Sequence, residues 1–186
     1  MTLMSMRQIQ QGLDEKFLPL EPMVTGSRLI AGGVSETARA ACERTLSTHF
    51  PPAFRDNIES FSFGDLAIGP VAFCGTGDYL KELIQLNTQV VWWWGEAQRP
   101  ADLLLIALSD PYSILLDTAR GSVRAFDTEL GWRSSTLVAS DFDTYLRGVG
   151  TAMLLRESVA DRPAFAAELL TEVGGTDLRY WQSLVR

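Results

Sequence analysis

The stretch ADLLLIALS, residues 101–109, constrains the fold more than any other part of this chain. Within it, residues 103–108 form an unbroken apolar run. Apolar runs of four to eight residues are typical of strands that are buried on both faces. The sequence therefore predicts a central buried strand over residues 103–108.

A hairpin is predicted directly after this strand. Residues 113–118 and 122–128 are two short segments of strand character, joined only by the tripeptide ARG. In the first segment Ile114 and Leu116 alternate with Leu115 and Asp117, as expected when successive side chains point to opposite faces of a sheet. Antiparallel pairing follows, because so short a connection cannot cross over to make a parallel pair.

Helical patterns lie before and after these strands. Residues 1–18 repeat apolar side chains at spacings of three and four, and Ser35 is placed to cap a helix that runs to about residue 48. Pro52 suits the first turn of the next helix. Further helices are expected over 78–87, from a cap at Ser140, and from Pro163, and a short or interrupted strand is expected near 66–73. Because helices and strands are segregated along the chain, we expect one α+β domain over residues 1–186, with a mostly antiparallel sheet covered by N- and C-terminal helices.

Composition and charge limit the classes of function. The chain has 186 residues, 46% of them apolar, and a net charge of −7 with a pI near 4.7. Such a surface repels a phosphate backbone, so direct nucleic-acid binding is not expected. An acidic surface suits a basic protein partner, although net charge also serves solubility alone. Neither a basic leader with an apolar segment nor a membrane-length apolar window occurs, so a cytoplasmic location is expected, with no membrane contact.

No catalytic or metal-binding constellation can be assembled from the sequence. His49 is the single histidine and lacks spaced cysteine or histidine partners, and Cys42 and Cys74 are expected to be small buried hydrophobes. The loop GTGDY, residues 75–79, is interpreted as a structural turn, with anion binding as the weaker alternative. Asp110, Asp117 and Asp127 are interpreted as strand-end and turn carboxylates that face water rather than as metal ligands. We therefore expect no enzyme activity, no cofactor and no metal.

The stretch VVWWWGE, residues 90–96, raises the possibility of an interface. If the segment is extended, Trp92 and Trp94 face one way and Trp93 the other, so hiding all three indoles requires a pocket on each side. Core anchoring is the simpler interpretation, but tryptophans are favoured anchors of protein interfaces. Residues 96–143 contain eight acidic residues and four arginines, which gives this segment a net charge of −4. The candidate partner-binding residues are Trp92, Trp93, Trp94, Glu96, Asp110, Asp127, Glu129, Asp141 and Asp143.

Three segments resemble the SUKH superfamily, the family of the yeast cell-wall-synthesis regulators and of many bacterial immunity proteins. ETARAACERTLSTHFPPAFRDNIESFSFG, residues 36–64, is similar to the family's opening helix, proline step and second helix. LLLIALSDPYSILLDTARGSVRAFDTE, residues 103–129, resembles its apolar strand, aspartate-bearing turn and hairpin. VASDFDTYLRGV, residues 138–149, resembles the start of its next helix. By this comparison residues 34–156 correspond to the SUKH core, residues 1–33 to an N-terminal extension and residues 157–186 to a C-terminal helical extension.

The resemblance implies a function in binding. Bacterial members are implied to bind and block toxins, many of which are nucleases or nucleic-acid deaminases. The expectation is therefore a cytoplasmic immunity protein that neutralises a cognate, basic toxin in a 1:1 complex. The alternative is a non-enzymatic regulatory adaptor or hub protein of the same fold. On either account the hairpin and its carboxylates serve as scaffold and binding surface.

Overall fold

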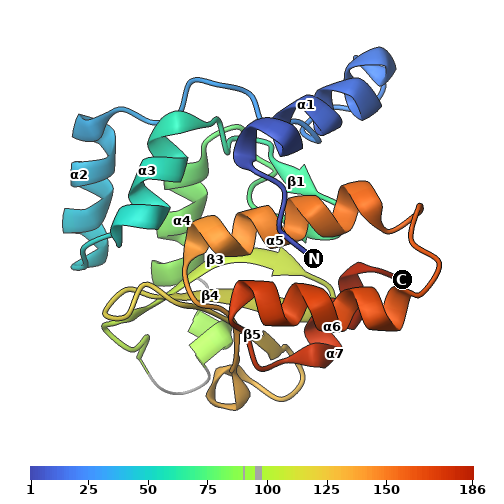
Figure 1. The fold of residues 1–186 in the computed structure, drawn as a ribbon. Helices are drawn as coiled ribbons and strands as arrows, with labels where there is room; N and C mark the ends of the chain where they lie inside the picture. The colour runs from blue at the N-terminus through green and yellow to red at the C-terminus, as the bar shows by residue number, and fades with distance from the viewer. Residues whose placement is uncertain (90, 95–97) are drawn as a thin grey trace.

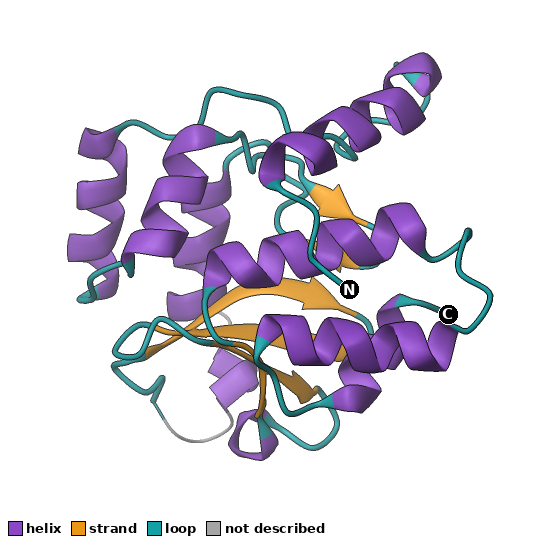
Figure 2. Ribbon diagram, in the orientation of Figure 1, coloured by secondary structure: helices purple, strands orange, loops and turns teal. Residues whose placement is uncertain are grey.

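The fold is α+β. A computed structural model describes residues 1–89, 91–94 and 98–186, with residues 91 and 92 described by their backbone only. Within this part of the chain, a six-stranded antiparallel sheet is combined with seven α-helices (Figure 1). The strands lie in the order β1-β2-β3-β4-β5-β6, so each strand pairs with its neighbour in the sequence. Figure 2 shows the strands in orange and the helices in purple.

The centre of the sheet is formed by the strands that the apolar run and the hairpin pattern predicted. These are β3 (Leu103–Ser109), β4 (Tyr112–Asp117) and β5 (Val123–Asp127). The segment expected to be a short or interrupted strand folds as a small hairpin, β1 (Ala67–Ile68) and β2 (Val71–Ala72), because Gly69 adopts a left-handed φ of 58° at the turn. Strand β6 (Thr136–Ala139) was not expected from the sequence.

Helices flank the sheet in both halves of the sequence. The α-helices are α1 (Met6–Phe17), α2 (Glu36–Leu46), α3 (Pro52–Ser60), α4 (Tyr79–Thr88), α5 (Phe142–Leu155), α6 (Arg162–Val173) and α7 (Leu178–Leu184). The described ranges also contain the 3₁₀ turns η1 (Leu18–Leu20), η2 (Val91–Trp94) and η3 (Trp132–Ser134). Ser35 caps α2 as predicted, but α5 is capped by the Asp141 carboxylate and not by Ser140. No helix among the described residues is both long and apolar enough to cross a membrane.

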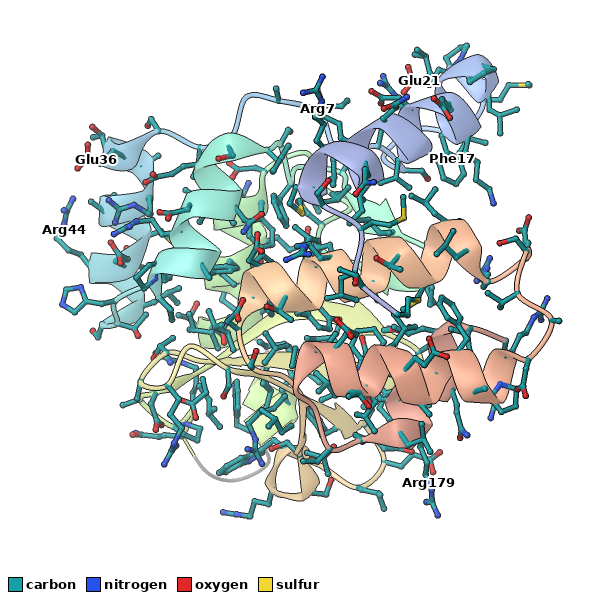
Figure 3. All side chains as sticks on the ribbon, in the orientation of Figure 1. Arg7, Phe17, Glu21, Glu36, Arg44 and Arg179 are labelled. Carbon is teal, nitrogen blue, oxygen red and sulfur yellow. The ribbon has the colours of Figure 1, made fainter. Side chains whose placement is uncertain are left out.

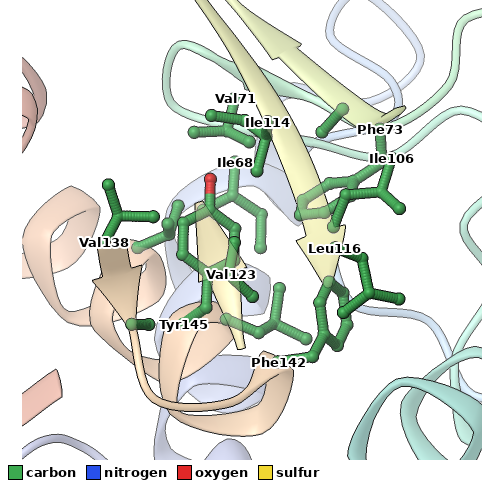
Figure 4. Close-up of a cluster of buried hydrophobic side chains, with 14 of the residues drawn as sticks. Ile68, Val71, Phe73, Ile106, Ile114, Leu116, Val123, Val138, Phe142 and Tyr145 are labelled. Atoms are coloured by element: carbon green, nitrogen blue, oxygen red, sulfur yellow. The ribbon is translucent and has the colours of Figure 1, made fainter. Parts of the chain in front are cut away.

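The main hydrophobic core lies between one face of the sheet and the helices. Ile114 and Leu116 of β4 and Val123 of β5 point into it and meet the aromatic rings of α5 (Figure 4). These side chains are fully buried. Each aliphatic side chain removed from water in this way contributes roughly 1.5–3 kcal/mol to stability. The alternation of Ile114 and Leu116 with Leu115 therefore assigns the two faces of the sheet as the sequence predicted.

The opposite face of the sheet has a much thinner cover. Leu105, Leu115 and Phe126 point to this side, and the indoles of Trp93 and Trp94 lie over them. Because the cover comes from η2 and η3 rather than from a long helix, this second cluster is small. It lies next to the surface described below as the candidate site.

Both ends of the chain belong to the main core. Ile9 of α1 is fully buried and lies so close to Gly150 of α5 that a Cβ atom there would be 2.6 Å from it. At the other end, the hydroxyl of Tyr180 shares a 2.6 Å hydrogen bond with that of Tyr145, and Trp181 Nε1 donates to the Val138 carbonyl at 3.0 Å. The segments assigned by resemblance as extensions thus contribute to the same hydrophobic cluster as the rest.

Helix α4 completes one edge of β3. Strand β2 pairs with β3 only at Leu108, so upstream of that residue β3 is paired with β4 on one side, and no described strand covers its other edge. Asn87 takes the place of a strand: its Oδ1 accepts from the Leu105 N–H, and its Nδ2 donates to the Leu105 carbonyl, both at 2.8 Å. The Tyr79 hydroxyl donates to the Ile106 carbonyl at 3.0 Å. Two helix side chains therefore satisfy buried backbone groups that a longer β2 would otherwise pair.

Candidate functional site

Three of the predicted acidic residues meet at one end of the sheet. Asp110 lies in the turn between β3 and β4, and Asp127, the last residue of β5, lies opposite Tyr112 in the antiparallel register. Glu129 follows two residues later. The backbone N–H and the hydroxyl of Thr128 both donate to the Pro111 carbonyl, at 3.1 and 2.9 Å. These two hydrogen bonds link the turn between β3 and β4 to the segment that follows β5. The topology thus gathers Asp110, Asp127 and Glu129, as the predicted docking surface requires.

The segment after β5, residues 127–131, is referred to here as the Leu130 loop. Asp127 organises it: its Oδ1 accepts from the Glu129 N–H at 2.9 Å, and its carbonyl accepts from the N–H groups of Leu130 and Gly131 at 2.9 and 3.1 Å. The positive φ of Gly131, 77°, then turns the chain into η3. As a result the Leu130 side chain points outward and is 72% exposed.

A hollow lies on each side of Leu130. The first, of about 250 Å³, is walled by the indoles of Trp94 and Trp132 and by Arg133. The second, of about 400 Å³, runs between the end of β5 and the start of α7 and contains Tyr112, Asp127 and Asp177. Phe126 and Leu130 border both hollows. The Leu130 loop is thus an apolar projection between an aromatic and a polar depression.

The acidic residues at this end of the sheet are not paired with any arginine or lysine among the residues that the structure describes. Within the part of the chain that the structure describes, Asp110, Asp127, Glu129 and Asp177 form no salt bridge. Arg179 borders the second hollow without contacting either of its carboxylates, and it extends outward from α7 (Figure 3). Four carboxylates therefore outnumber the nearby cations.

The pKa of the Tyr112 hydroxyl is shifted by burial and by these charges. Burial raises the pKa of its hydroxyl, and the carboxylates of Asp177 and Asp127 raise it further. Arg179 and Arg186 oppose the increase, but the net shift is upward. The two carboxylates therefore disfavour a further negative charge at the Tyr112 hydroxyl.

The structure places two other predicted residues away from this surface. Strand β6 ends beside Val123, at the opposite end of β5 from Asp127, and Asp141 and Asp143 follow it. Asp141 is occupied in capping α5, where it accepts from the Thr144 N–H at 2.8 Å. Asp143 lies 3.8 Å from Arg147 and accepts from the Asn57 amide. These two residues do not join the other predicted acids, and Glu96 lies outside the described residues.

The tryptophan segment is a 3₁₀ turn rather than an extended strand. Trp93 and Trp94 are 8% and 4% exposed and cover the second face of the sheet, whereas the side chain of Trp92 lies outside the described residues. In an extended segment Trp93 and Trp94 would face opposite sides, whereas the tight turn directs both onto Leu105, Leu115 and Phe126. Trp132 lies edge-on to Trp94 at 6.0 Å, and the Arg133 guanidinium lies 5.1 Å from the Trp132 ring. A direct contact of the tryptophans with a partner remains a prediction.

Asp117 has a different role from the other aspartates. Its carboxylate is buried and accepts from the N–H groups of Ala119 and Arg120, at 3.1 and 2.9 Å, and from the Arg120 guanidinium at 3.0 Å. The expectation of a water-facing turn carboxylate is thus wrong for Asp117. Tyr112 pairs with Asp127 and lies five residues from Asp117, so the two aspartates are separated by roughly 16 Å at about 3.3 Å per residue. They cannot share a metal ion, and no group of three metal-ligating side chains occurs among the described residues.

The glycine loop before α4 already contains an anionic group of the protein itself. Glu82 Oε2 accepts from the Cys74 thiol at 2.9 Å, from the Gly75 N–H at 3.2 Å and from the Thr76 hydroxyl at 2.9 Å. Burial acts to raise the pKa of Glu82, but these donors outweigh burial and the pKa is lowered. The loop is therefore fixed by Glu82. The His49 side chain is fully exposed on the surface.

Sequence reasoning missed several residues of this surface: Tyr112, Leu130, Trp132, Asp177 and Arg179. The signal for Leu130 was present, because the stretch DTELGW places a single leucine between a glutamate and a turn glycine. Asp177 and Arg179 are about fifty residues further along the chain and reach the site only because α7 docks beside β6. No protein-family model matches the chain, and no curated protein matches it.

Proposed function

We propose that this chain is a cytoplasmic, SUKH-type immunity protein that binds a basic toxin in a 1:1 complex and neutralises it without catalysis. The observation that carries the proposal is the group of four carboxylates around the exposed Leu130 loop, which form no ion pair with any described residue. A nuclease must hold phosphate with cationic side chains, and an acidic surface is complementary to such a cleft.

The resemblance supports the proposal through the positions of the quoted segments. Residues 36–64 form α2, α3 and the connection between them, and residues 103–129 form β3, β4, β5 and their turns. The segments that carry the resemblance therefore include the strands whose ends form the acidic surface. The regulatory adaptor of the same fold would use a surface of the same kind, so the two functions differ in the partner and not in the site.

The chemistry of the buried titratable groups also favours binding over catalysis. Cys42 lies in the core, where burial raises the pKa of its thiol to about 12. Burial likewise raises the pKa of Cys74, and the Glu82 carboxylate raises it further. A nucleophilic cysteine requires the opposite shift. Burial, together with the Glu82 carboxylate at Cys74, is the main cause of the raised pKa of both thiols.

The test is neutralisation of a candidate toxin. The gene next to that of this chain is searched for a secreted protein with a C-terminal toxin domain, and the domain is expressed with and without the chain. We expect growth to be rescued and a 1:1 complex to co-purify. The double variant Asp110→Lys, Glu129→Lys should lose rescue. Asp102→Lys, at an exposed acid on the opposite end of the sheet that forms no ion pair with the described residues, should retain it. A toxin that kills equally well beside the wild-type chain would contradict the proposal.

A further inference from the structure

The Leu130 loop has the properties of a preformed interface anchor. Leu130 is 72% exposed, yet the loop that carries it is fixed by the three hydrogen bonds to Asp127 and the two to Pro111 described above. Ordering a mobile loop reduces affinity, so an apolar side chain on a rigid loop binds at a lower entropic cost. The most exposed large apolar residue of the described chain, Met23 at 86%, lies instead in the N-terminal segment after α1.

The polar hollow beside Leu130 has two carboxylates, Asp127 and Asp177, that form no salt bridge within the described ranges of the chain. Asp127 uses Oδ1 for the Glu129 N–H, while its Oδ2 has no hydrogen-bond partner among the residues that the structure describes. Asp177 accepts from the Tyr180 N–H at 3.0 Å and from the Thr136 hydroxyl at 2.5 Å, and each of its oxygens retains a further lone pair. The Tyr112 ring lies in the same hollow.

The shape of the hollow also suits a long basic side chain. Its volume of about 400 Å³ is within the range of roughly 300–1,000 Å³ common for binding pockets, and Leu130 and Leu178 line it together with the polar groups. An arginine or lysine has an apolar stem and a charged head, so the leucines and the Tyr112 ring can contact the stem while Asp127 binds the head.

We propose that the partner inserts an arginine or lysine side chain into the hollow between Asp127 and Asp177, while Leu130 enters an apolar pocket on the partner's surface. This inference rests on the proposed function, because it specifies how the toxin would be recognised. Its two halves make different kinetic predictions. The charged contact governs encounter and orientation, whereas the apolar contact governs the lifetime of the complex.

The first arm tests Leu130 by surface plasmon resonance with the catalytically inactivated toxin domain. Leu130→Ala should accelerate dissociation at least tenfold with little change in the association rate, as expected for a central anchor. Met23→Ala removes a more exposed apolar side chain elsewhere and should leave both rates unchanged. Equal rates for Leu130→Ala and the wild type would overturn the role of the loop.

The second arm tests the hollow with two substitutions of opposite sign. Asp127→Asn preserves the acceptor for the Glu129 N–H but removes the charge, and it should weaken binding about tenfold. Arg179→Ala removes a cation from the same hollow and should strengthen binding. A misfolded surface would weaken binding in both variants, so opposite signs identify a cation site.

The outcomes separate this inference from the function on which it rests. If the wild type binds the toxin but Arg179→Ala weakens the complex, the hollow takes an acidic group and the inference is wrong. If neither variant differs from the wild type, the partner docks elsewhere and the immunity function still stands. If the wild-type chain binds no basic toxin, both proposals fall together.

Discussion

Asn87 should be one of the most sensitive positions for stability, because it substitutes for a missing strand. Replacing it with leucine, Asn87→Leu, keeps a side chain of similar size but leaves the N–H and the carbonyl of Leu105 buried without partners. Each unsatisfied buried group costs about 1–3 kcal/mol, and a buried leucine returns about 1 kcal/mol relative to an amide. We therefore expect the free energy of unfolding to fall by about 1–5 kcal/mol, against the 5–15 kcal/mol typical of a domain.

The assay is urea denaturation followed by circular dichroism. The midpoint should shift to lower urea while the slope stays constant, since the area exposed on unfolding does not change. Thr88→Ala, at the exposed neighbouring position of α4, serves as the control and should change stability by less than about 0.5 kcal/mol. A loss below about 1 kcal/mol for Asn87→Leu would refute the reasoning that α4 completes the edge of β3.

Three further predictions concern pH and close contacts. The pKa of Glu82 is lowered in the folded protein, so its contribution to stability is present above its unfolded pKa of about 4.3 and is lost as pH falls through the folded value. Glu82→Gln should therefore flatten the acid limb of a curve of stability against pH. It should also speed alkylation of Cys74, because, beyond the effect of burial, the Glu82 carboxylate raises the pKa of that thiol. Asp127→Asn should lower the raised pKa of Tyr112, measured by absorbance titration, and an unchanged value would place Asp127 too far from the hollow. Gly148→Ala normally favours a helix by about 1 kcal/mol, but here the new Cβ would lie 2.6 Å from a buried indole of α7, so thermal unfolding should show a loss of about 1–3 kcal/mol.

The elements that sequence predicted correctly are those with a strong local signal. Residues 103–108 are apolar without interruption, and the tripeptide ARG leaves the hairpin no other arrangement, so β3, β4 and β5 follow from the sequence. Strand β6 has only four residues, and α7 only seven, so neither is long enough to show a period. Both elements are stabilised by tertiary contacts, such as the Trp181 hydrogen bond to Val138.

The candidate site was predictable only in part, for a related reason. Asp110, Asp127 and Glu129 come together because β3 and β5 end at the same end of the sheet, which the hairpin pattern already implies. Asp177 reaches the site through the docking of α7, and this depends on buried contacts that no sequence pattern encodes. The same limit applies to the tryptophans. An extended segment would direct Trp93 and Trp94 to opposite sides, whereas the 3₁₀ turn over Val91–Trp94 brings both into one buried cluster.

The salt dependence of association tests the central claim most directly. The association rate constant of the wild-type chain with its toxin should be measured by stopped flow over a range of ionic strength, beside the double variant Asp110→Lys, Glu129→Lys. The account predicts fast association for the wild type that falls steeply with added salt, and slower association with a flattened salt dependence for the variant. A wild-type rate that does not respond to salt, or a variant that matches the wild type at every ionic strength, would contradict recognition through the acidic end of the sheet.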